Sequence, residues 1–243
     1  MNPIIIIPAR MSASRLPGKP LAMIAGVPMI VQVWRRAREA DLGPVAVACG
    51  EIEIADAVRD YGGMAVLTDP HLASGSDRVF HALRALDPLG HHDVVVNLQG
   101  DLPSLPPSYI GKVLEPLARG SVDIATLVAP ITGEEEARAE SVVKAACSFA
   151  PGTDIAPVLY FSRLAVPWGD GALWHHIGIY GWRREALQRF VELPPSGLEV
   201  SERLEQLRAL EAGMRMAAAR VERAPFGVDT PADLEKIRKD MES

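Results

Sequence analysis

Strand and helix patterns alternate along the first half of this chain. Continuous apolar runs, which are typical of parallel strands buried on both faces, occur at 4–7, 45–49, 64–68 and 94–98. Apolar residues at helical spacing predict a helix that begins at Pro28 and further helices over 51–61, 77–86 and 108–117. Strands and helices that alternate in this way form a parallel sheet between two layers of helices. The alternation therefore predicts a three-layer α/β fold with a mostly parallel sheet.

The pattern changes after about residue 120. Strands are predicted at 123–129, 142–149, 158–161, 174–180 and 214–221, with helices at 183–192, 202–211 and 232–241. Strands that follow strands indicate a smaller antiparallel extension. No segment is rich enough in Pro, Gly or Ser to force a second independent domain, so we expect one domain over 1–243, with parts at about 1–120, 121–225 and 226–243.

Charge is unevenly distributed along the chain. The formal net charge of −6 argues against a general nucleic-acid binder. The first 38 residues nevertheless hold six cations and no acid (Arg10, Arg15, Lys19, Arg35, Arg36 and Arg38), which leaves −12 on the rest. A basic segment on an acidic chain indicates a local anion site, although the cluster at 35–38 also fits a solvated helix face.

Cysteine usage and hydropathy bear on the compartment. Cys49 and Cys147 lie in apolar runs without metal-ligand spacing, as expected of buried thiols in a reducing compartment. Met1–Ile7 lacks the charged start of a signal peptide, and no apolar run approaches the ~20 residues of a membrane span. These features predict a cytoplasmic protein without membrane association.

The loop Pro8–Pro20 follows the first predicted strand, where ligands bind in open α/β sheets. It has three cations and no acid, and its small residues let a ligand approach the backbone N–H groups (Ala9, Ser12, Ala13, Ser14 and Gly18). This composition suits a polyphosphate. The loop matches neither GxxxxGK[ST] nor GxGxxG, which disfavours a standard nucleotide triphosphatase or dinucleotide fold. An ordinary solvated loop is the alternative.

Two aspartates follow apolar segments in a way that suits a metal. Asp101 comes directly after the strand at 94–98. Asp229 follows the strand predicted at 214–221 by a short turn and precedes the last predicted helix, so we expect both carboxylates at one edge of the sheet. Mg²⁺ prefers hard oxygen ligands and typically takes one or two carboxylates together with substrate phosphates. The alternative for Asp101 is a Gly-Asp turn. Capping of the helix by Thr230 and Asp233 explains those two residues but not Asp229.

Seven segments together carry a resemblance to a known family. They are IIIIPARMSASRLPGKPL (4–21), SGSDR (74–78), VNLQGDLP (96–103), YFSR (160–163), HHIGIYGWR (175–183), LEQLRALEAG (204–213) and GVDTPADLEKIR (227–238). In this order the chain resembles the 3-deoxy-manno-octulosonate (Kdo) cytidylyltransferases over nearly its whole length. Other sugar nucleotidyltransferases share the first, third and last segments in looser form, whereas FSR, HHIGIYG and LEQLR are more particular to the Kdo enzymes.

The resemblance implies a nucleotidyltransferase (Rossmann-like) fold and a reaction. CMP passes from CTP to the anomeric hydroxyl of Kdo with release of pyrophosphate, for the inner core of Gram-negative lipopolysaccharide. It implies that CTP is bound by Pro8, Ala9, Arg10, Arg15, Lys19, Ser74, Gly75 and Gln99. It also implies Mg²⁺ on Asp101 and Asp229, which would be catalytic together with Arg15 and Lys19, and a homodimer. The first part of the chain would bind CTP, and the part from 121 to 225 would bind sugar and dimerise.

The sugar-binding residues implied by the resemblance are Arg163, His176, Tyr180, Glu202 and Gln206. Each has a structural alternative: Arg163 could pair with a surface acid, and Glu202 and Gln206 could stabilise one helix at i,i+4 spacing. The chain departs from the common family pattern at Leu102, where an acid is frequent, at Cys49-Gly50, where Asp is frequent, and in the short segment 168–174.

Two other functions stay open on the sequence. The acceptor could be another acidic sugar, such as an amino-Kdo or a sialic acid. Alternatively, the chain could bind CTP without turnover, although a pure binder has little need for both Asp101 and Asp229. No Ser/His/Asp or Cys/His triad is visible, which fits transfer by positioning and charge.

Overall fold

The computed structural model describes residues 1–12 and 15–242. The chain divides into two compact units: unit 1 comprises residues 1–110 and 225–243, and unit 2 comprises residues 111–224. Among the described residues, no helix combines the length and the apolar character that crossing a membrane requires.

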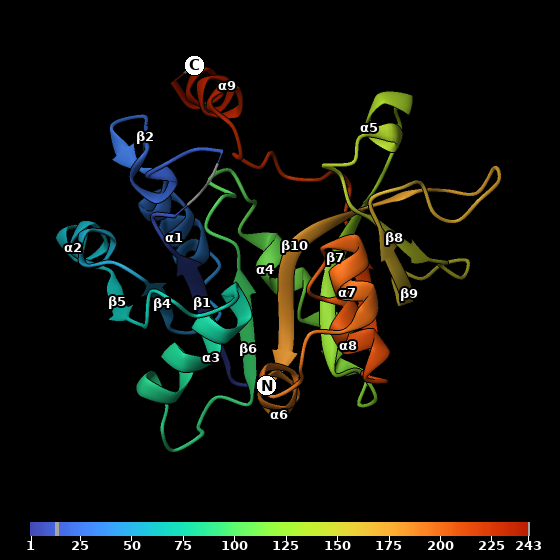
Figure 1. Cartoon of the computed structure of the whole chain (residues 1–243), viewed down its shortest axis with the longest axis horizontal. Helices are drawn as coiled ribbons and strands as arrows, with labels where there is room; N and C mark the ends of the chain where they lie inside the picture. The colour runs from blue at the N-terminus through green and yellow to red at the C-terminus, as the bar shows by residue number, and fades with distance from the viewer. Residues whose placement is uncertain (13–14, 243) are drawn as a thin grey trace. The chain divides into compact units, whose positions relative to one another are not determined.

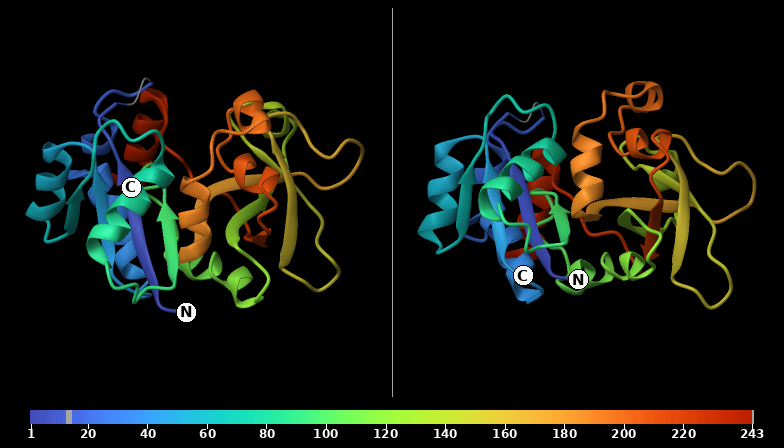
Figure 2. Two further views of the ribbon diagram at one scale, coloured as in Figure 1. Left: turned by 60° about the horizontal axis from the view of Figure 1, so that its bottom comes forward. Right: turned by 90° about the horizontal axis from the view of Figure 1, so that it is seen from below.

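Unit 1 contains a parallel sheet of four strands, in the order β5-β4-β1-β6 (Figure 1). Its elements are β1 (Pro3–Ala9), η1 (Lys19–Leu21), β2 (Met23–Ile24), β3 (Val27–Pro28), α1 (Met29–Glu39), β4 (Val45–Cys49), α2 (Ile52–Asp60), β5 (Met64–Leu67), α3 (Gly75–Leu86), β6 (Val94–Leu98) and α9 (Pro231–Glu242). The isoleucines of β1 are buried because helices cover both faces of the sheet. Right-handed crossovers place α1 and α2 on one face and α3 on the other (Figure 2). The predicted α/β architecture is confirmed.

Unit 2 contains a mixed sheet in the order β10-β7-β11-β9-β8. Its elements are η2 (Glu115–Ala118), β7 (Ile124–Pro130), α5 (Glu134–Arg138), β8 (Lys144–Cys147), β9 (Ile155–Ser162), β10 (Trp174–Arg183), α6 (Arg184–Val191), α7 (Gly197–Glu202), α8 (Leu207–Glu211) and β11 (Met216–Arg220), while α4 (Ser108–Lys112) spans the boundary. Only β7 and β11 pair in parallel, and the other pairings are antiparallel. The antiparallel extension expected after residue 120 is therefore present.

The predicted helix over 202–211 is wrong. The chain forms α7, which ends at Glu202, and α8, which begins at Leu207. Arg203 between them has φ 56°, a left-handed conformation that ends a helix. Glu202 and Gln206 therefore do not share one helix face. The α7 helix was missed in the sequence, although Ser196 and Glu199 form a capping box at its start.

Other boundaries differ in ways that matter for the site. The α3 helix begins at Gly75, two residues before the prediction, because the Ser74 hydroxyl accepts a hydrogen bond from the Asp77 N–H. The short hairpin of β2 and β3 was also missed. Its turn uses Ala25 (φ 48°) and Gly26 (φ 73°), and these positive φ angles suit a two-residue turn.

Candidate active site

Unit 1 contains an open cavity of about 780 Å³ beyond the carboxyl ends of its strands. All the residues predicted to bind CTP or metal line it, together with Met11, Ser12, Pro17, Pro20, Leu72, Arg78 and Gly100. Ala13 and Ser14, which were expected to offer backbone donors, lie outside the described residues. The structure thus gathers predicted residues from four separate segments of the sequence around one cavity.

The loop after β1 is held by two backbone features. The Met11 N–H donates to Glu51 Oε2 at 2.9 Å, which ties the loop to the start of α2. Gly18 has φ 70°, a left-handed conformation that suits glycine, and it precedes the short helix η1. Lys19 is the first residue of η1, so its side chain projects from a fixed turn rather than from a free loop.

Lys19 joins the two predicted metal ligands. Its ammonium nitrogen Nζ lies 2.9 Å from Asp101 Oδ2 and 2.9 Å from Asp229 Oδ1. The two carboxylate oxygens therefore lie within twice that distance of each other, although the residues are far apart in sequence. The Lys19 side chain is 15% exposed, whereas that of Asp229 is 47% exposed. The expected approach of the two carboxylates is confirmed.

Electrostatics favour the charged form of Lys19. Burial by itself lowers the pKa of the ammonium, but Asp101 and Asp229 outweigh burial and raise the pKa above its ordinary value. Arg15 adds a second cation, because its Nη2 lies 3.2 Å from Asp229 Oδ2. The Arg15 side chain is 62% exposed, so solvent screens this pair more than the Lys19 pairs.

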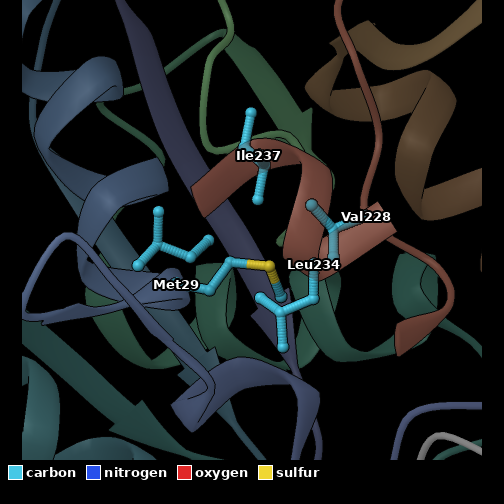
Figure 3. Close-up of a cluster of buried hydrophobic side chains, with 5 residues drawn as sticks. Met29, Val228, Leu234 and Ile237 are labelled. Atoms are coloured by element: carbon cyan, nitrogen blue, oxygen red, sulfur yellow. The ribbon is translucent and has the colours of Figure 1, made fainter. Parts of the chain in front are cut away.

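Asp229 reaches the cavity by a route that differs from the sequence prediction. The sequence places it after the strand at 214–221, but that strand, β11, belongs to unit 2. In the structure, the Val228 N–H donates to the Asp101 carbonyl at 3.0 Å, which fixes the two backbones side by side. Val228 also belongs to a buried cluster with Ile24, Met29, Leu234 and Ile237, which docks α9 on unit 1 (Figure 3).

The start of α9 is capped as predicted. The Asp233 N–H donates to the Thr230 hydroxyl oxygen, and Asp233 Oδ2 accepts from the Thr230 N–H at 2.8 Å. Pro231 is the first residue of the helix. Because Thr230 and Asp233 satisfy each other, the Asp229 carboxylate is left to face Arg15 and Lys19.

Arg78 is a cavity residue that the sequence reasoning missed, although it ends the SGSDR motif. It is only 2% exposed, and its guanidinium donates to the Thr68 hydroxyl oxygen and to the Pro70 carbonyl. A Cβ atom at Gly50 would lie 3.2 Å from Arg78 Nη1. Gly50 therefore leaves room for the Arg78 side chain at the end of β4.

Leu102 also has a structural explanation. It is buried, and its Cδ2 would lie 3.7 Å from a Cβ atom at Gly227. Its side chain thus packs beside the segment that carries Asp229.

Among the described residues, no group of three or more His, Cys, Asp or Glu side chains converges as a metal site. Asp101 and Asp229 remain as a pair of hard oxygen donors that converge on one cationic group, which is the donor set that Mg²⁺ takes when phosphates complete its coordination.

The predicted sugar residues lie in unit 2, and two of them bind each other. Glu202 accepts from the Ser162 hydroxyl at 2.8 Å and from the Arg163 N–H at 3.1 Å. The Arg163 guanidinium donates to three backbone carbonyls, those of Glu140, Glu202 and Arg203. These carbonyls include the end of α7, where a cation is favourable. The expected surface acid is not the partner of Arg163 among the residues that the structure describes.

A buried lysine completes this cluster. Lys144 Nζ donates to the Ala139 carbonyl at 2.7 Å and to the Arg163 carbonyl at 2.9 Å. Burial lowers the pKa of this ammonium, while Glu136 and Glu140 oppose that effect. The backbone of residue 163 is therefore held at both its N–H and its carbonyl group.

His176 is buried on β10, and the half-buried Tyr180 lies next to it. The His176 and Tyr180 rings are 5.5 Å apart, and His176 Nε2 lies 3.1 Å from the Thr126 hydroxyl oxygen. Burial, followed by the neighbouring His175, lowers the pKa of His176 to about 3. Burial and then the carboxylate of Glu205 raise the pKa of Tyr180. Sequence reasoning passed over Glu205, although it lies within the LEQLR motif beside the predicted Gln206, which is buried.

A distant solved structure and a family model define the class of protein to which the chain belongs. A nucleotidyl transferase from Methanothermobacter has the same fold, with a TM-score of 0.64 at 16% identity over 99% of this chain and 97% of that chain. The cytidylyltransferase family model matches residues 4–216. The chain is thus a member of the cytidylyltransferase family, with a nucleotidyltransferase fold.

Closer matches define the particular family. The 3-deoxy-manno-octulosonate cytidylyltransferase of Parvibaculum lavamentivorans is 62% identical over 98% of this chain and 92% of its own length. A CMP:2-keto-3-deoxy-manno-octonic acid synthetase solved in complex with CTP has a TM-score of 0.90 at 36% identity, covering 100% of this chain and 99% of that chain. The chain belongs to the 3-deoxy-manno-octulosonate cytidylyltransferases, and the resemblance seen in its sequence is confirmed.

Proposed function

We propose that this chain transfers CMP from CTP to the anomeric hydroxyl of Kdo and releases pyrophosphate. The observation that carries the proposal is the cavity of unit 1, where Lys19 and Arg15 meet Asp101 and Asp229. The solved relative that holds CTP and the curated relatives named as Kdo cytidylyltransferases support the choice of substrates.

The residues of the cavity suit an in-line transfer. The anomeric hydroxyl gives up its proton to solvent as its oxygen attacks the α-phosphorus, and the bond to the pyrophosphate oxygen breaks with its electron pair on the leaving group. Arg10, Arg15 and Lys19 hold the triphosphate and stabilise the charge that develops on the departing pyrophosphate. Pro8, Ala9, Ser74, Gly75 and Gln99 form the wall proposed for the cytosine.

The carboxylate pair suits a divalent cation. Asp101 and Asp229 would hold Mg²⁺ because both already converge on the Lys19 ammonium. When bound, Mg²⁺ supplies positive charge that neutralises the phosphate oxygens. Lys19 and Arg15 orient the triphosphate from the same cavity.

Sugar binding is assigned to unit 2. Arg163, His176, Tyr180 and Gln206 are the proposed sugar residues, and Glu202 acts on Arg163 through its hydrogen bonds. An acidic sugar needs a cation for its carboxylate, and Arg163 can serve because its present partners are neutral carbonyls.

A homodimer in the cytoplasm is part of the proposal. The outward face of β9 exposes Leu159, and the segment that follows exposes Leu164 and Trp168, the last at 99%. The strands β9 and β10 are already paired within unit 2, so we expect faces rather than edges to meet across a two-fold axis. The thiols of Cys49 and Cys147 are free and buried, which is in keeping with a reducing compartment. Sedimentation at micromolar concentration checks the dimer, and a monomer would overturn it.

A substrate panel tests the proposed reaction. Pyrophosphate release is measured with CTP, UTP, ATP and GTP, each with Kdo, 8-amino-Kdo or a sialic acid and Mg²⁺. We expect turnover with CTP and Kdo to exceed every other combination. Faster turnover with an amino-Kdo or a sialic acid than with Kdo would show that this other sugar is the acceptor. Tight CTP binding in calorimetry without pyrophosphate release would instead support a binding protein without turnover.

A further inference from the structure

We propose that Lys19 and a divalent cation are alternative partners of one carboxylate pair. The Lys19 ammonium occupies the point between Asp101 and Asp229 when nucleotide is absent, and it leaves that point when a cation binds there. This inference rests on the proposed function, since it concerns the carboxylates assigned to Mg²⁺.

The geometry allows only one cation at this point. Lys19 Nζ is 2.9 Å from an oxygen of each carboxylate, so both oxygens face the same small volume. A Mg²⁺ ion ligated by both carboxylates would need that volume as well, because its bonds to oxygen are only about 2.1 Å long. An ammonium held in the same place would repel the ion at short range.

The carboxylates are positioned without help from Lys19. The Asp101 carbonyl accepts from the Val228 N–H, which fixes the backbone at both aspartates. Asp229 is followed directly by the capped start of α9, and its second oxygen pairs with Arg15. Removal of the lysine side chain therefore leaves both donors near their present places and removes a competitor.

Lys19 has another partner available once it leaves. Its flexible stem carries the ammonium along the lining of the cavity that also holds Arg10 and Arg15, where a triphosphate is proposed to bind. Without nucleotide, Lys19 and Arg15 already balance the two carboxylates, so a divalent cation alone adds charge that nothing offsets. A triphosphate that arrives with the cation takes up the released ammonium. The exchange thus couples cation binding to nucleotide binding.

Cation binding to the full chain without nucleotide tests the exchange. Free Mn²⁺ is followed by electron paramagnetic resonance in the wild type and in Lys19→Met, with Mg²⁺ added as a competitor. In the wild type, Mn²⁺ has to displace the ion pairs of Lys19, and each partly exposed pair changes an equilibrium constant by up to about fivefold. We therefore expect Lys19→Met to bind Mn²⁺ about fivefold to tenfold more tightly. Lys112→Met is the matched control, because it removes the same charge from a surface pair with Glu115, and we expect no change.

Three outcomes would overturn the exchange. The first is unchanged or weaker Mn²⁺ binding in Lys19→Met, which would mean that Lys19 organises the carboxylates instead of competing for them. The second is Mn²⁺ binding that persists when Asp101→Asn and Asp229→Asn are combined with Lys19→Met, because the ion would then be elsewhere. The third is tighter binding in Lys19→Arg equal to that in Lys19→Met, since arginine keeps the competing charge. Circular dichroism checks that each variant is folded, and Lys19→Gln, which also removes the charge, replaces Lys19→Met in the comparison if Lys19→Met does not fold. Wild-type pyrophosphate release from CTP and Kdo is measured separately, so its absence would count against the proposed function alone.

Discussion

The cavity of unit 1 and the polar cluster of unit 2 use the same kinds of residue in different ways. In unit 1, Arg15 and Lys19 line a cavity and pair with carboxylates that also line it. In unit 2, the charges of Arg163 and Lys144 meet backbone carbonyls, and Glu202 accepts from a neighbouring strand. Ion pairs between side chains at an open cavity can exchange partners, whereas contacts to backbone groups hold segments in place.

The contrast bears on how charged residues in motifs are interpreted. A charge on a loop at the end of a strand can be tied to ligand chemistry when its partners are other cavity side chains. A charge bonded to carbonyls at the end of a helix, as Arg163 is at α7, first explains the local fold. Variants in the two units should therefore fail in different ways, by lost turnover in unit 1 and by lost stability or sugar binding in unit 2.

The largest effect is expected from the aspartates of the cavity. Asp101→Asn or Asp229→Asn keeps the shape of the side chain but removes a charge where phosphate charge develops, so we expect turnover to fall by about 10²–10³-fold. CTP binding measured by calorimetry should change much less. Asp56→Asn, at an exposed pair with Arg59, is the control and should leave turnover near the wild-type value. Equal losses of CTP affinity and turnover would contradict a role in the transfer step.

Substitution of Lys19 and of Arg15 should lower the rate of pyrophosphate release to different extents. Lys19→Ala should lower the rate of pyrophosphate release by about 10²–10³-fold, because the ammonium is partly buried and works in a low-dielectric site. Arg15→Ala should cost less, because the guanidinium is largely exposed. Both residues lie outside the apolar core, so the midpoint of thermal unfolding should stay close to that of the wild type. A larger effect of Arg15→Ala than of Lys19→Ala would show that burial does not set the relative importance of the two cations.

Acid should destabilise unit 2 through His176. The pKa is about 3 in the folded chain and near 6.5 when unfolded, so the unfolded state binds more protons between these values. The contribution to stability is complete above pH 6.5 and is lost as the pH falls toward 3, at up to about 1.4 kcal/mol per pH unit. We expect the free energy of unfolding to fall by about 2 kcal/mol more in the wild type than in His176→Gln between pH 7 and pH 5. Parallel pH curves in urea denaturation would show that His176 is not held neutral.

The smallest of these effects is expected from Glu202. Glu202→Gln replaces an acceptor of the Arg163 N–H with an amide, so we expect about 1 kcal/mol of lost stability in urea denaturation. The KM for Kdo should rise while the KM for CTP stays constant, because the change lies in unit 2. Glu135→Gln, at an exposed position on α5, provides a matched control. Wild-type stability with a raised KM for Kdo would instead support direct contact between Glu202 and the sugar.

The sequence predicted the elements whose signals are local. The isoleucines of β1 and the valines of β6 form strands because β-branched residues buried on both faces leave few other solutions. The start of α9 was also predicted from a local signal, because Thr230, Pro231 and Asp233 cap the helix within one turn. The loop at 8–20 was identified from charge and small residues without knowledge of its partners.

The missed features depend on contacts that the local sequence does not show. Arg203 adopts a left-handed conformation without glycine, so nothing nearby indicated that the helix over 202–211 would break. Asp229 was expected to reach Asp101 by following a strand, but a backbone hydrogen bond and the buried cluster of α9 bring it there. Arg78 was overlooked because its burial in the cavity lining depends on contacts with Gly50 and Thr68, which follow the strands β4 and β5.

The central claim is that nucleotide chemistry depends on the cavity of unit 1, while unit 2 governs the acceptor. The most direct test is steady-state pyrophosphate release over a matrix of CTP and Kdo concentrations, with Mg²⁺ fixed, for wild type, Asp229→Asn and Arg163→Met. We predict that Asp229→Asn lowers kcat with little change in either KM, and that Arg163→Met raises the KM for Kdo while the KM for CTP is unchanged. A raised KM for CTP in Arg163→Met, or an unchanged kcat in Asp229→Asn, would contradict this division.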